Sequence, residues 1–210
     1  MSERERIDWA ERWAGGDYQG RSAPSPLIVA WADRLPRGRA LDLACGSGRN
    51  ALYLAERGFE VDALDIAEPA LKLVRDAARE RGLAVNTILA DLDDHPLPSE
   101  TYDLITTSFY LNRNLIPVMR DTLKPGGFAL HEQHYLTDSG VSGPTDPLFR
   151  LGSNELLRLF LDFRVRFFAE GLTWEPERDG GRLIALQQLV AQKPPASCEP
   201  PAGGDGERLG

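Results

Sequence analysis

The chain has 210 residues, of which 42% are hydrophobic and 27% are charged, so it is long enough for one soluble globular domain with a sizeable core. Its formal net charge of −8 disfavours the broad basic surface that nucleic acids require, so we expect no nucleic-acid partner. The two cysteines, Cys45 and Cys198, suggest no disulfide framework, and no apolar run approaches membrane-spanning length, which together predict a cytoplasmic protein without a membrane span.

Strand and helix patterns alternate from residue 38 onward, which predicts an α/β fold with a parallel sheet covered on both faces. We expect one domain over residues 1–193 that begins with a helical cap segment over 1–37. The aromatic residues Trp9, Trp13 and Tyr18 of this segment are expected either to pack permanently on the domain or to close over a ligand. From Pro194 the composition turns to Pro, Gly, Ala and charge, which predicts a disordered tail over 194–210.

The first predicted elements are, in chain order, a strand at 39–44, a helix at 48–57 followed by Gly58, a strand at 59–65, a helix from Pro69 to Gly82 and a strand at 85–90. A polar loop at 91–98 then leads to a strand at 102–110, a helix at 114–122, a tight turn at 123–127 and a strand at 128–134.

The loop 137–147 is rich in Gly, Ser, Thr, Asp and Pro and is long enough to act as a lid. Ser153 is expected to cap a helix that carries four apolar residues, Leu156, Leu157, Phe160 and Leu161. The last two strands, at 163–169 and 182–192, flank a predicted loop at 171–181 and are expected to pair antiparallel.

The stretch Ala40–Asn50 joins the first strand to a helix through a turn with two glycines. Gly46 and Gly48 lack the Cβ atoms that would keep a ligand away from the backbone at the strand's carboxyl edge. Asp42 lies inside the apolar strand, where a carboxylate is unfavourable unless a cation or a hydrogen-bond donor meets it. The ammonium and sulfonium groups of S-adenosylmethionine would meet that need.

Two other interpretations of this turn remain open. It is also compatible with an ordinary strand-to-helix turn, or with a dinucleotide fingerprint, because Gly46, Gly48 and Ala51 have the required spacing and Asp65 follows as a candidate ribose ligand. Asp42 argues against the dinucleotide, since a pyrophosphate on the helix N-terminus gains nothing from a carboxylate beneath it.

Several short motifs occur in order along the chain: the glycine turn, Asp65 ending the second strand, Asp91-Leu92 after the third, Tyr102-Asp103-Leu104 opening the fourth, and Leu123–Gly127 before the fifth. With this set the chain resembles the class I S-adenosylmethionine-dependent methyltransferases over about residues 38–192. The segments Trp9–Tyr18 and Phe149–Leu157 resemble the tellurite-resistance-type and related small-molecule methyltransferases. The resemblance implies a Rossmann-like, doubly wound, seven-stranded sheet, mostly parallel with an antiparallel last strand, and S-adenosylmethionine as cofactor.

The resemblance also implies cofactor-binding roles for ten residues, most of them at or near the carboxyl ends of the strands. Gly46 and Gly48 would let the aminoacyl part approach, with Asp42 and the carbonyl of Ala44 near its ammonium and Arg12 paired with its carboxylate. Asp65, followed by Ile66, would accept both ribose hydroxyls, Asp91 and the backbone of Leu92 would bind the adenine, and Thr107 or Ser108 would line the methionine side. The competing roles are a helix cap for Asp65, a solvated loop for Asp91 and a surface ion pair for Arg12.

The acceptor site is expected beyond the same strand ends, where the chain has Tyr110, Asn112 and Arg113 after the fourth strand and His131, Glu132, His134 and Tyr135 at the fifth. We take His134 and Tyr110 as the catalytic candidates, and each histidine has the alternative of being satisfied by backbone. The spacing of His131-Glu-Gln-His134 on a strand is not that of a zinc site, so we expect no metal.

The predicted function is therefore methyl transfer from S-adenosylmethionine to a small-molecule acceptor, such as a thiol, selenium or tellurium species. A non-catalytic sensor or interaction domain that keeps the fold is the alternative, followed by an NAD-binding oxidoreductase. The sequence leaves open the acceptor, the need for a general base and the oligomeric state.

Overall fold

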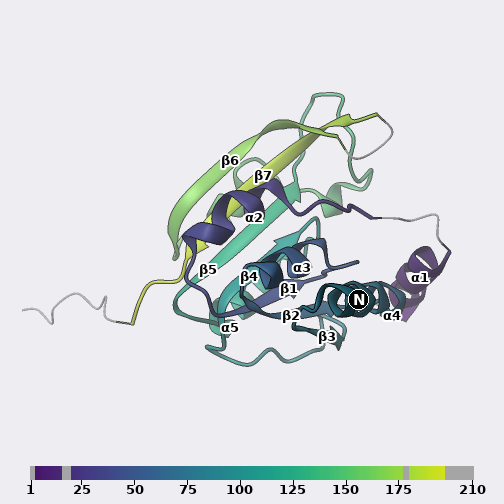
Figure 1. Cartoon of the computed structure of the whole chain (residues 1–210). Coiled ribbons are helices and arrows are strands. Elements are labelled where there is room, and N and C mark those ends of the chain that lie inside the picture. The colour runs from purple at the N-terminus through teal and green to yellow at the C-terminus, as the bar shows by residue number, and fades with distance from the viewer. Residues whose placement is uncertain (1–2, 16–19, 177–179, 197–210) are drawn as a thin grey trace, which may run out of the picture.

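The computed structural model describes residues 3–15, 20–176 and 180–196, in which helices and strands alternate (Figure 1). The helices are α1 (Glu3–Ala14), α2 (Pro26–Trp31), α3 (Arg49–Glu56), α4 (Glu68–Arg81), α5 (Leu115–Thr122) and α6 (Glu155–Leu159), with short 3₁₀ turns at Ala32–Arg34 and Pro147–Phe149. The strands are β1 (Arg39–Leu43), β2 (Glu60–Asp65), β3 (Val85–Leu89), β4 (Tyr102–Ser108), β5 (Leu123–His134), β6 (Arg164–Glu175) and β7 (Arg182–Gln192).

The strands form one seven-stranded sheet in the order β3-β2-β1-β4-β5-β7-β6. The first five strands pair in parallel, whereas β7 runs antiparallel to both β5 and β6. The predicted α/β fold, with seven strands and an antiparallel last strand, is confirmed. The chain reverses its strand order between β1 and β4, and in open α/β sheets the ligand crevice lies at such a switch point.

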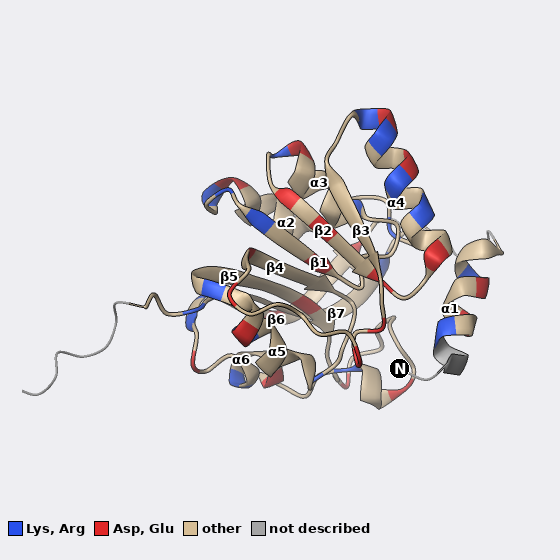
Figure 2. Cartoon of the chain, turned by 90° about the horizontal axis from the view of Figure 1, so that it is seen from below, with Lys and Arg blue, Asp and Glu red and all other residues tan. Residues whose placement is uncertain are grey.

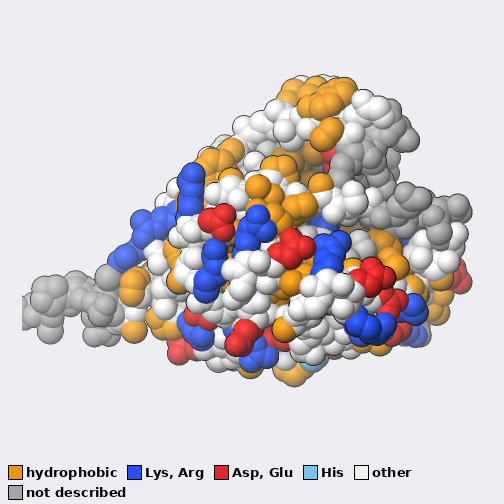
Figure 3. Space-filling view, viewed as in Figure 1, with side chains coloured by type: hydrophobic (Ala, Val, Ile, Leu, Met, Phe, Trp, Pro, Cys, Tyr) orange, Lys and Arg blue, Asp and Glu red, His pale blue; other side chains and the backbone are white. Residues whose placement is uncertain are grey.

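Alternate residues along the strands build two apolar layers, one on each face of the sheet. Ala40 packs with α2, α3 and α4 on one face, whereas Leu41 and Leu43 pack with α5 and α6 on the other. Charged residues of both signs follow the length of α4, and acidic residues also occur on the central strands β1 and β2 (Figure 2). On the face drawn in Figure 3, basic and acidic side chains intermix.

Glycines end the predicted helices where expected. Gly82 follows α4 in the left-handed conformation with φ +66°, and Gly58 follows α3 with φ +83°, so both predicted helix ends are confirmed. The predicted apolar face of α4, with Leu71, Val74 and Ala78, is buried.

Three predicted boundaries are wrong. Residues 123–127 belong to β5 instead of forming a turn, because Leu123 pairs with Tyr102 before an irregularity in the register, and Gly126 and Gly127 exchange backbone hydrogen bonds with Lys193. The fourth strand ends at Ser108 rather than at residue 110, since Phe109 has φ +61°. Strand β6 continues to Glu175, so the first half of the predicted 171–181 loop pairs with β7.

The cap predicted for α6 is also wrong. Asn154, with φ +53°, precedes the helix, and the hydroxyl of Ser153 donates to Glu170 on β6. Leu156 and Phe160 are buried as expected, but Leu161 is exposed. The helix ends at Leu159, because the chain turns there toward β6.

The N-terminal segment contributes α1, which contacts α4, and α2, which covers the sheet beside β5 (Figure 1). Tyr18 and residues 197–210 of the predicted tail lie outside the described residues. No helix among the described residues has the length and apolar character needed to cross a membrane. The extent of the domain, residues 1–193, stays a prediction.

Candidate functional site

Two adjoining pockets lie beyond the carboxyl ends of the strands. The smaller pocket, of about 140 Å³, is lined by the turn after β1, the end of β2, the residues after β3 and β4, and the aromatic face of α1. The larger pocket, of about 910 Å³, extends toward α5 and the segment that precedes α6. The two share four lining residues, Trp9, Leu92, Phe109 and Tyr110.

Six of the ten residues predicted to bind the cofactor line the smaller pocket: Asp42, Ala44, Gly46, Asp65, Ile66 and Leu92. The other four, Arg12, Gly48, Asp91 and Thr107, do not line it. Arg12 and Gly48 are placed by helix packing, Thr107 by the alternation of side chains along β4, and Asp91 by the loop after β3.

Asp42 finds its partners inside the protein. One carboxylate oxygen accepts the hydroxyl of Thr106 at 2.9 Å, and the other accepts the backbone N–H of Ala51 in the first turn of α3 at 3.1 Å. Burial raises the pKa of Asp42 to about 7, against the opposing effects of Thr106, Arg49 and Ala51. A ligand cation is therefore not needed to explain this buried carboxyl, although its edge lines the smaller pocket.

The raised pKa predicts how pH changes the free energy of unfolding. The folded chain keeps a proton on Asp42 up to about pH 7, whereas the unfolded carboxyl loses it near its ordinary value of 3.8. The contribution of the Asp42 carboxyl to the free energy of unfolding of the wild type is therefore lost as pH rises from about 4 through about 7. Asparagine does not titrate, so the free energy of unfolding of Asp42→Asn should not change with pH through this position. We expect the difference in free energy of unfolding, Asp42→Asn minus wild type, to increase by about 2 kcal/mol from pH 5 to pH 8. Urea unfolding at both pH values measures this, with the exposed Asp138→Asn as control, and a constant difference would contradict it.

Asp65 holds the turn after β1 against the start of α4. One oxygen accepts the N–H of Gly46 at 2.7 Å and the other accepts the N–H of Ala67 at 2.9 Å. Burial raises the pKa of Asp65, and the N–H groups of Ala67, Gly46 and Ile66 oppose that rise. A carboxylate has about four acceptor positions, so these N–H groups leave Asp65 with capacity for a ligand hydroxyl. The predicted capping role and ligand role are compatible.

The two glycines of the turn have different surroundings. A Cβ on Gly46 would lie 3.1 Å from the Trp13 ring, inside the smaller pocket. A Cβ on Gly48 would lie 2.7 Å from Cγ2 of Val74 on α4, with φ at +78°. Gly48 therefore lets α3 approach α4, and it does not line the smaller pocket, so its closeness to a ligand stays a prediction.

The loop after β3 contributes Leu92 but not the Asp91 side chain. The carboxylate of Asp91 accepts the N–H of Asp93 at 3.0 Å within its own loop. Ala90 and Leu92 line the smaller pocket on either side of it. The adenine role of Asp91 stays a prediction.

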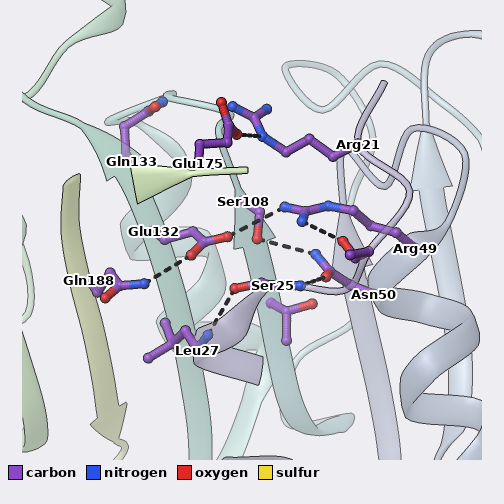
Figure 4. A network of polar contacts seen from close by, with 12 residues as sticks. Arg21, Ser25, Leu27, Arg49, Asn50, Ser108, Glu132, Gln133, Glu175 and Gln188 are labelled. Carbon is purple, nitrogen blue, oxygen red and sulfur yellow. Dashed lines mark hydrogen bonds and ion pairs between the residues drawn. The ribbon is translucent and has the colours of Figure 1, made fainter. Parts of the chain in front are cut away.

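Strand parity puts Ser108, rather than Thr107, in the smaller pocket. Successive side chains of β4 point to opposite faces, so Ser108 shares the face of Thr106 while Thr107 is buried on the other. The hydroxyl of Ser108 accepts from the amide of Asn50 at 3.2 Å, and the oxygen of that amide accepts the N–H of Ser25 at 2.9 Å (Figure 4). Of the two residues expected on the methionine side, Ser108 lines the pocket and Thr107 does not, and a contact of either with the cofactor stays a prediction.

Arginines other than Arg12 line the smaller pocket. Arg12 is exposed and lies over the Trp9 ring at 5.1 Å, beside the larger pocket, so its pairing with a ligand carboxylate stays a prediction. Arg21 pairs with Glu175, and Arg49 pairs with the buried Glu132 at 3.4 Å (Figure 4). Both guanidinium groups line the smaller pocket, and each already pairs with a carboxylate of the protein.

Phe109 separates the two pockets in a strained backbone conformation. Its φ of +61° is unusual for a bulky residue and costs about 1–3 kcal/mol. The ring is held between the Arg21 guanidinium, 3.6 Å from its centroid, and the His134 ring, with centroids 5.0 Å apart. Such strain at a pocket wall is typical of a functional site.

The catalytic candidates separate in the structure. Tyr110 lines both pockets, whereas neither His134 nor His131 lines either one. Burial lowers the pKa of each histidine to about 4, so both imidazoles are neutral at pH 7. His134 is therefore part of the support beneath Phe109, and its predicted catalytic role receives no support from its position.

Sequence reasoning missed Arg21, Arg49, Asn50 and Phe109. Arg49 and Asn50 directly follow the glycine turn, so their position at the helix start was a usable signal. Arg21 and Phe109 gave no local signal. The contact of Arg21 with Glu175 joins residues 154 positions apart, and the backbone of Phe109 depends on the neighbouring strand.

Comparisons with known proteins agree on the family. A methyltransferase-domain model matches residues 40–127. The chain is 29% identical over 165 residues to the probable S-adenosyl-L-methionine-dependent methyltransferase TehB of Haemophilus influenzae, covering 74% of this chain and 57% of the relative. It is 30% identical over 180 residues to the ubiquinone/menaquinone biosynthesis C-methyltransferase UbiE of Cupriavidus metallidurans, covering 78% of this chain and 71% of the relative.

The fold agrees with a solved relative. The crystal structure of Haemophilus influenzae TehB superposes with a TM-score of 0.73 at 23% identity, covering 88% of this chain and 67% of that one. The chain spans little more than half the length of the curated TehB sequences. The ordered motifs, the strand order and these matches show that the chain belongs to the class I S-adenosylmethionine-dependent methyltransferases.

Proposed function

We propose that this chain binds S-adenosylmethionine in the smaller pocket and transfers its methyl group to a small molecule in the larger pocket. The observation that carries the proposal is that the two pockets adjoin across Phe109 and Tyr110 at the switch point of the sheet. Methyl donor and acceptor would meet at this wall. Cytoplasmic location remains part of the proposal.

The residues of the smaller pocket fit this cofactor. The Asp65 carboxylate retains acceptor capacity for a ribose hydroxyl, Leu92 gives an apolar surface for the adenine, and Arg21 and Arg49 can pair with a carboxylate. When bound, the cofactor supplies an electrophilic methyl group on a positively charged sulfur. The smaller pocket is narrow where Trp13 approaches Gly46, so we include opening of α1 as a lid in the proposal.

The larger pocket favours an organic acceptor over an inorganic one. Its volume of about 910 Å³ lies within the range of sites for drug-sized molecules, and apolar residues of α5 and its flanks form much of the wall. Among the acceptors that the sequence suggested, an organic thiol therefore fits better than selenite or tellurite. A thiolate has a free lone pair, so the chain's main task would be positioning.

Release of S-adenosylhomocysteine tests the proposal. We expect the protein with S-adenosylmethionine to release more product with thiophenol than with sodium selenite, sodium tellurite or no acceptor. Chromatographic quantification of S-adenosylhomocysteine measures this. If the protein binds S-adenosylhomocysteine but releases none above the acceptor-free rate with any compound, the non-catalytic sensor is favoured instead.

Replacing His134 with Ala is expected to slow single-turnover transfer to thiophenol by about tenfold or less, because a residue behind Phe109 can act only through orientation. Rates measured from pH 5 to pH 9 should keep the same pH dependence. A loss above about a hundredfold, with a pKa disappearing from the rate profile, would identify His134 as a general base. Tyr110→Phe is the comparison, since Tyr110 lines both pockets.

A further inference from the structure

Gln133 carries a buried polar group that the site described above does not use. Its side chain is only 2% exposed, near the end of β5. The amide oxygen accepts the backbone N–H of His134 at 2.8 Å, which fixes the orientation of the amide. Among the described residues, its NH₂ group donates to no protein acceptor, and it is not one of the polar atoms that solvent cannot reach.

This NH₂ group faces the larger pocket. Gln133 lines that pocket, together with Leu115 and Val118 of α5. The preceding residue on the strand, Glu132, points to the opposite face, where it pairs with Arg49 and accepts from Gln188 at 3.2 Å (Figure 4). Strand alternation thus separates the ion pair near the smaller pocket from the amide in the larger one.

Two other polar side chains of the larger pocket, Arg113 and Asn112, are already engaged. Arg113 pairs with Glu155 and donates to the carbonyl of Arg150 at 3.1 Å. The amide of Asn112 donates to Asp93 at 2.7 Å. The pocket therefore combines a largely apolar wall with an amide donor, on Gln133, that no protein group engages.

The NH₂ group of Gln133 is not one of the polar atoms that are both shut off from solvent and unpaired, so water in the pocket meets its donor capacity until a ligand enters. A ligand that displaces this water gains affinity only if it supplies an acceptor of its own. A ligand oxygen that enters the larger pocket would supply the missing acceptor, and a ligand that lacks one would leave the amide unpaired.

We propose that Gln133 selects the methyl acceptor by donating a hydrogen bond from its NH₂ group to a carbonyl oxygen of an otherwise apolar organic molecule. This inference rests on the proposed function, because it assigns the larger pocket to the acceptor. Gln133 is a specificity-determining residue in this scheme and takes no part in bond breaking.

The test uses two unreactive probes that differ in one carbonyl group, 1-tetralone and tetralin. Both are titrated into the full chain saturated with S-adenosylhomocysteine, and binding is followed by calorimetry. The variants are Gln133→Met, which keeps the shape of the side chain but removes the donor, and the control Gln192→Met. Gln192 is on β7 and lines neither pocket.

We expect wild type and Gln192→Met to bind 1-tetralone roughly three- to tenfold more tightly than tetralin, the range for one neutral hydrogen bond. Gln133→Met should bind the two probes equally and keep the wild-type affinity for tetralin and for S-adenosylhomocysteine. An equal preference for 1-tetralone in wild type and Gln133→Met would overturn the role of Gln133. Binding of neither probe would overturn the assignment of an organic acceptor. Failure to bind S-adenosylhomocysteine would instead count against the proposed function.

Discussion

Replacing Asp65 with Ala is expected to weaken the binding of S-adenosylhomocysteine by about tenfold or more. The carboxylate lines the smaller pocket at the end of β2 and is 8% exposed, so its hydrogen bonds to a ligand would be shielded from water. Hydrogen bonds to a charged group contribute about 1.5–3 kcal/mol, and 1.4 kcal/mol corresponds to a factor of ten in affinity. Isothermal titration calorimetry measures the change.

The loss of Asp65 also leaves two backbone N–H groups without their acceptor, those of Gly46 and Ala67. The melting temperature of the variant must therefore be measured alongside its affinity. Glu80→Ala, which removes an exposed carboxylate from α4, is the control. An unchanged dissociation constant in folded Asp65→Ala protein would restrict Asp65 to holding the turn.

Replacing Gly48 with Ala is expected to lower the free energy of unfolding by about 3 kcal/mol. The new Cβ would lie 2.7 Å from Cγ2 of Val74, and the residue would have to keep φ at +78°. Left-handed backbone costs roughly 1–2 kcal/mol for a non-glycine residue, and overpacking of a buried contact adds about 1–3 kcal/mol.

Gly58 provides a matched control for the backbone contribution alone. It has φ +83°, and a Cβ there would meet nothing within 4 Å. Gly58→Ala should therefore lose about 1–2 kcal/mol, the left-handed cost without the clash. In Gly48→Ala/Val74→Ala, part of the loss should be recovered as a favourable coupling energy in urea unfolding. Equal losses in Gly48→Ala and Gly58→Ala would contradict the contact with Val74.

Local patterns predicted the parallel half of the fold well. The helices α3 and α4 were predictable within about two residues because their apolar faces and following glycines agree. The start of β5 was not predictable, since Lys124-Pro-Gly-Gly127 reads as a turn when its pairing with β4 and Lys193 is unknown. The extent of β6 likewise depends on its long pairing with β7, which no local signal encodes.

The residues of the site were likewise predictable only where a local pattern of the sequence places them. Positions at the ends of strands, such as Asp65 and Gly46, were predictable because the carboxyl ends of parallel strands meet at one edge. To choose between Thr107 and Ser108, one must know which side chains of β4 point toward β1 and the pocket. The hydrogen bond from Thr106 to Asp42 gives this orientation. The position of Arg21 depends on Glu175, which lies 154 positions away, so no local pattern could predict it.

Calorimetric titration of the full chain with S-adenosylhomocysteine and, separately, with NADH tests the cofactor assignment most directly. Asp65, Leu92 and the two arginines of the smaller pocket suit an aminoacyl nucleoside. We expect saturable binding of S-adenosylhomocysteine that weakens in Asp65→Ala, and no measurable heat with NADH. Tight binding of NADH without a response to S-adenosylhomocysteine would contradict the proposed cofactor and the methyl transfer built on it.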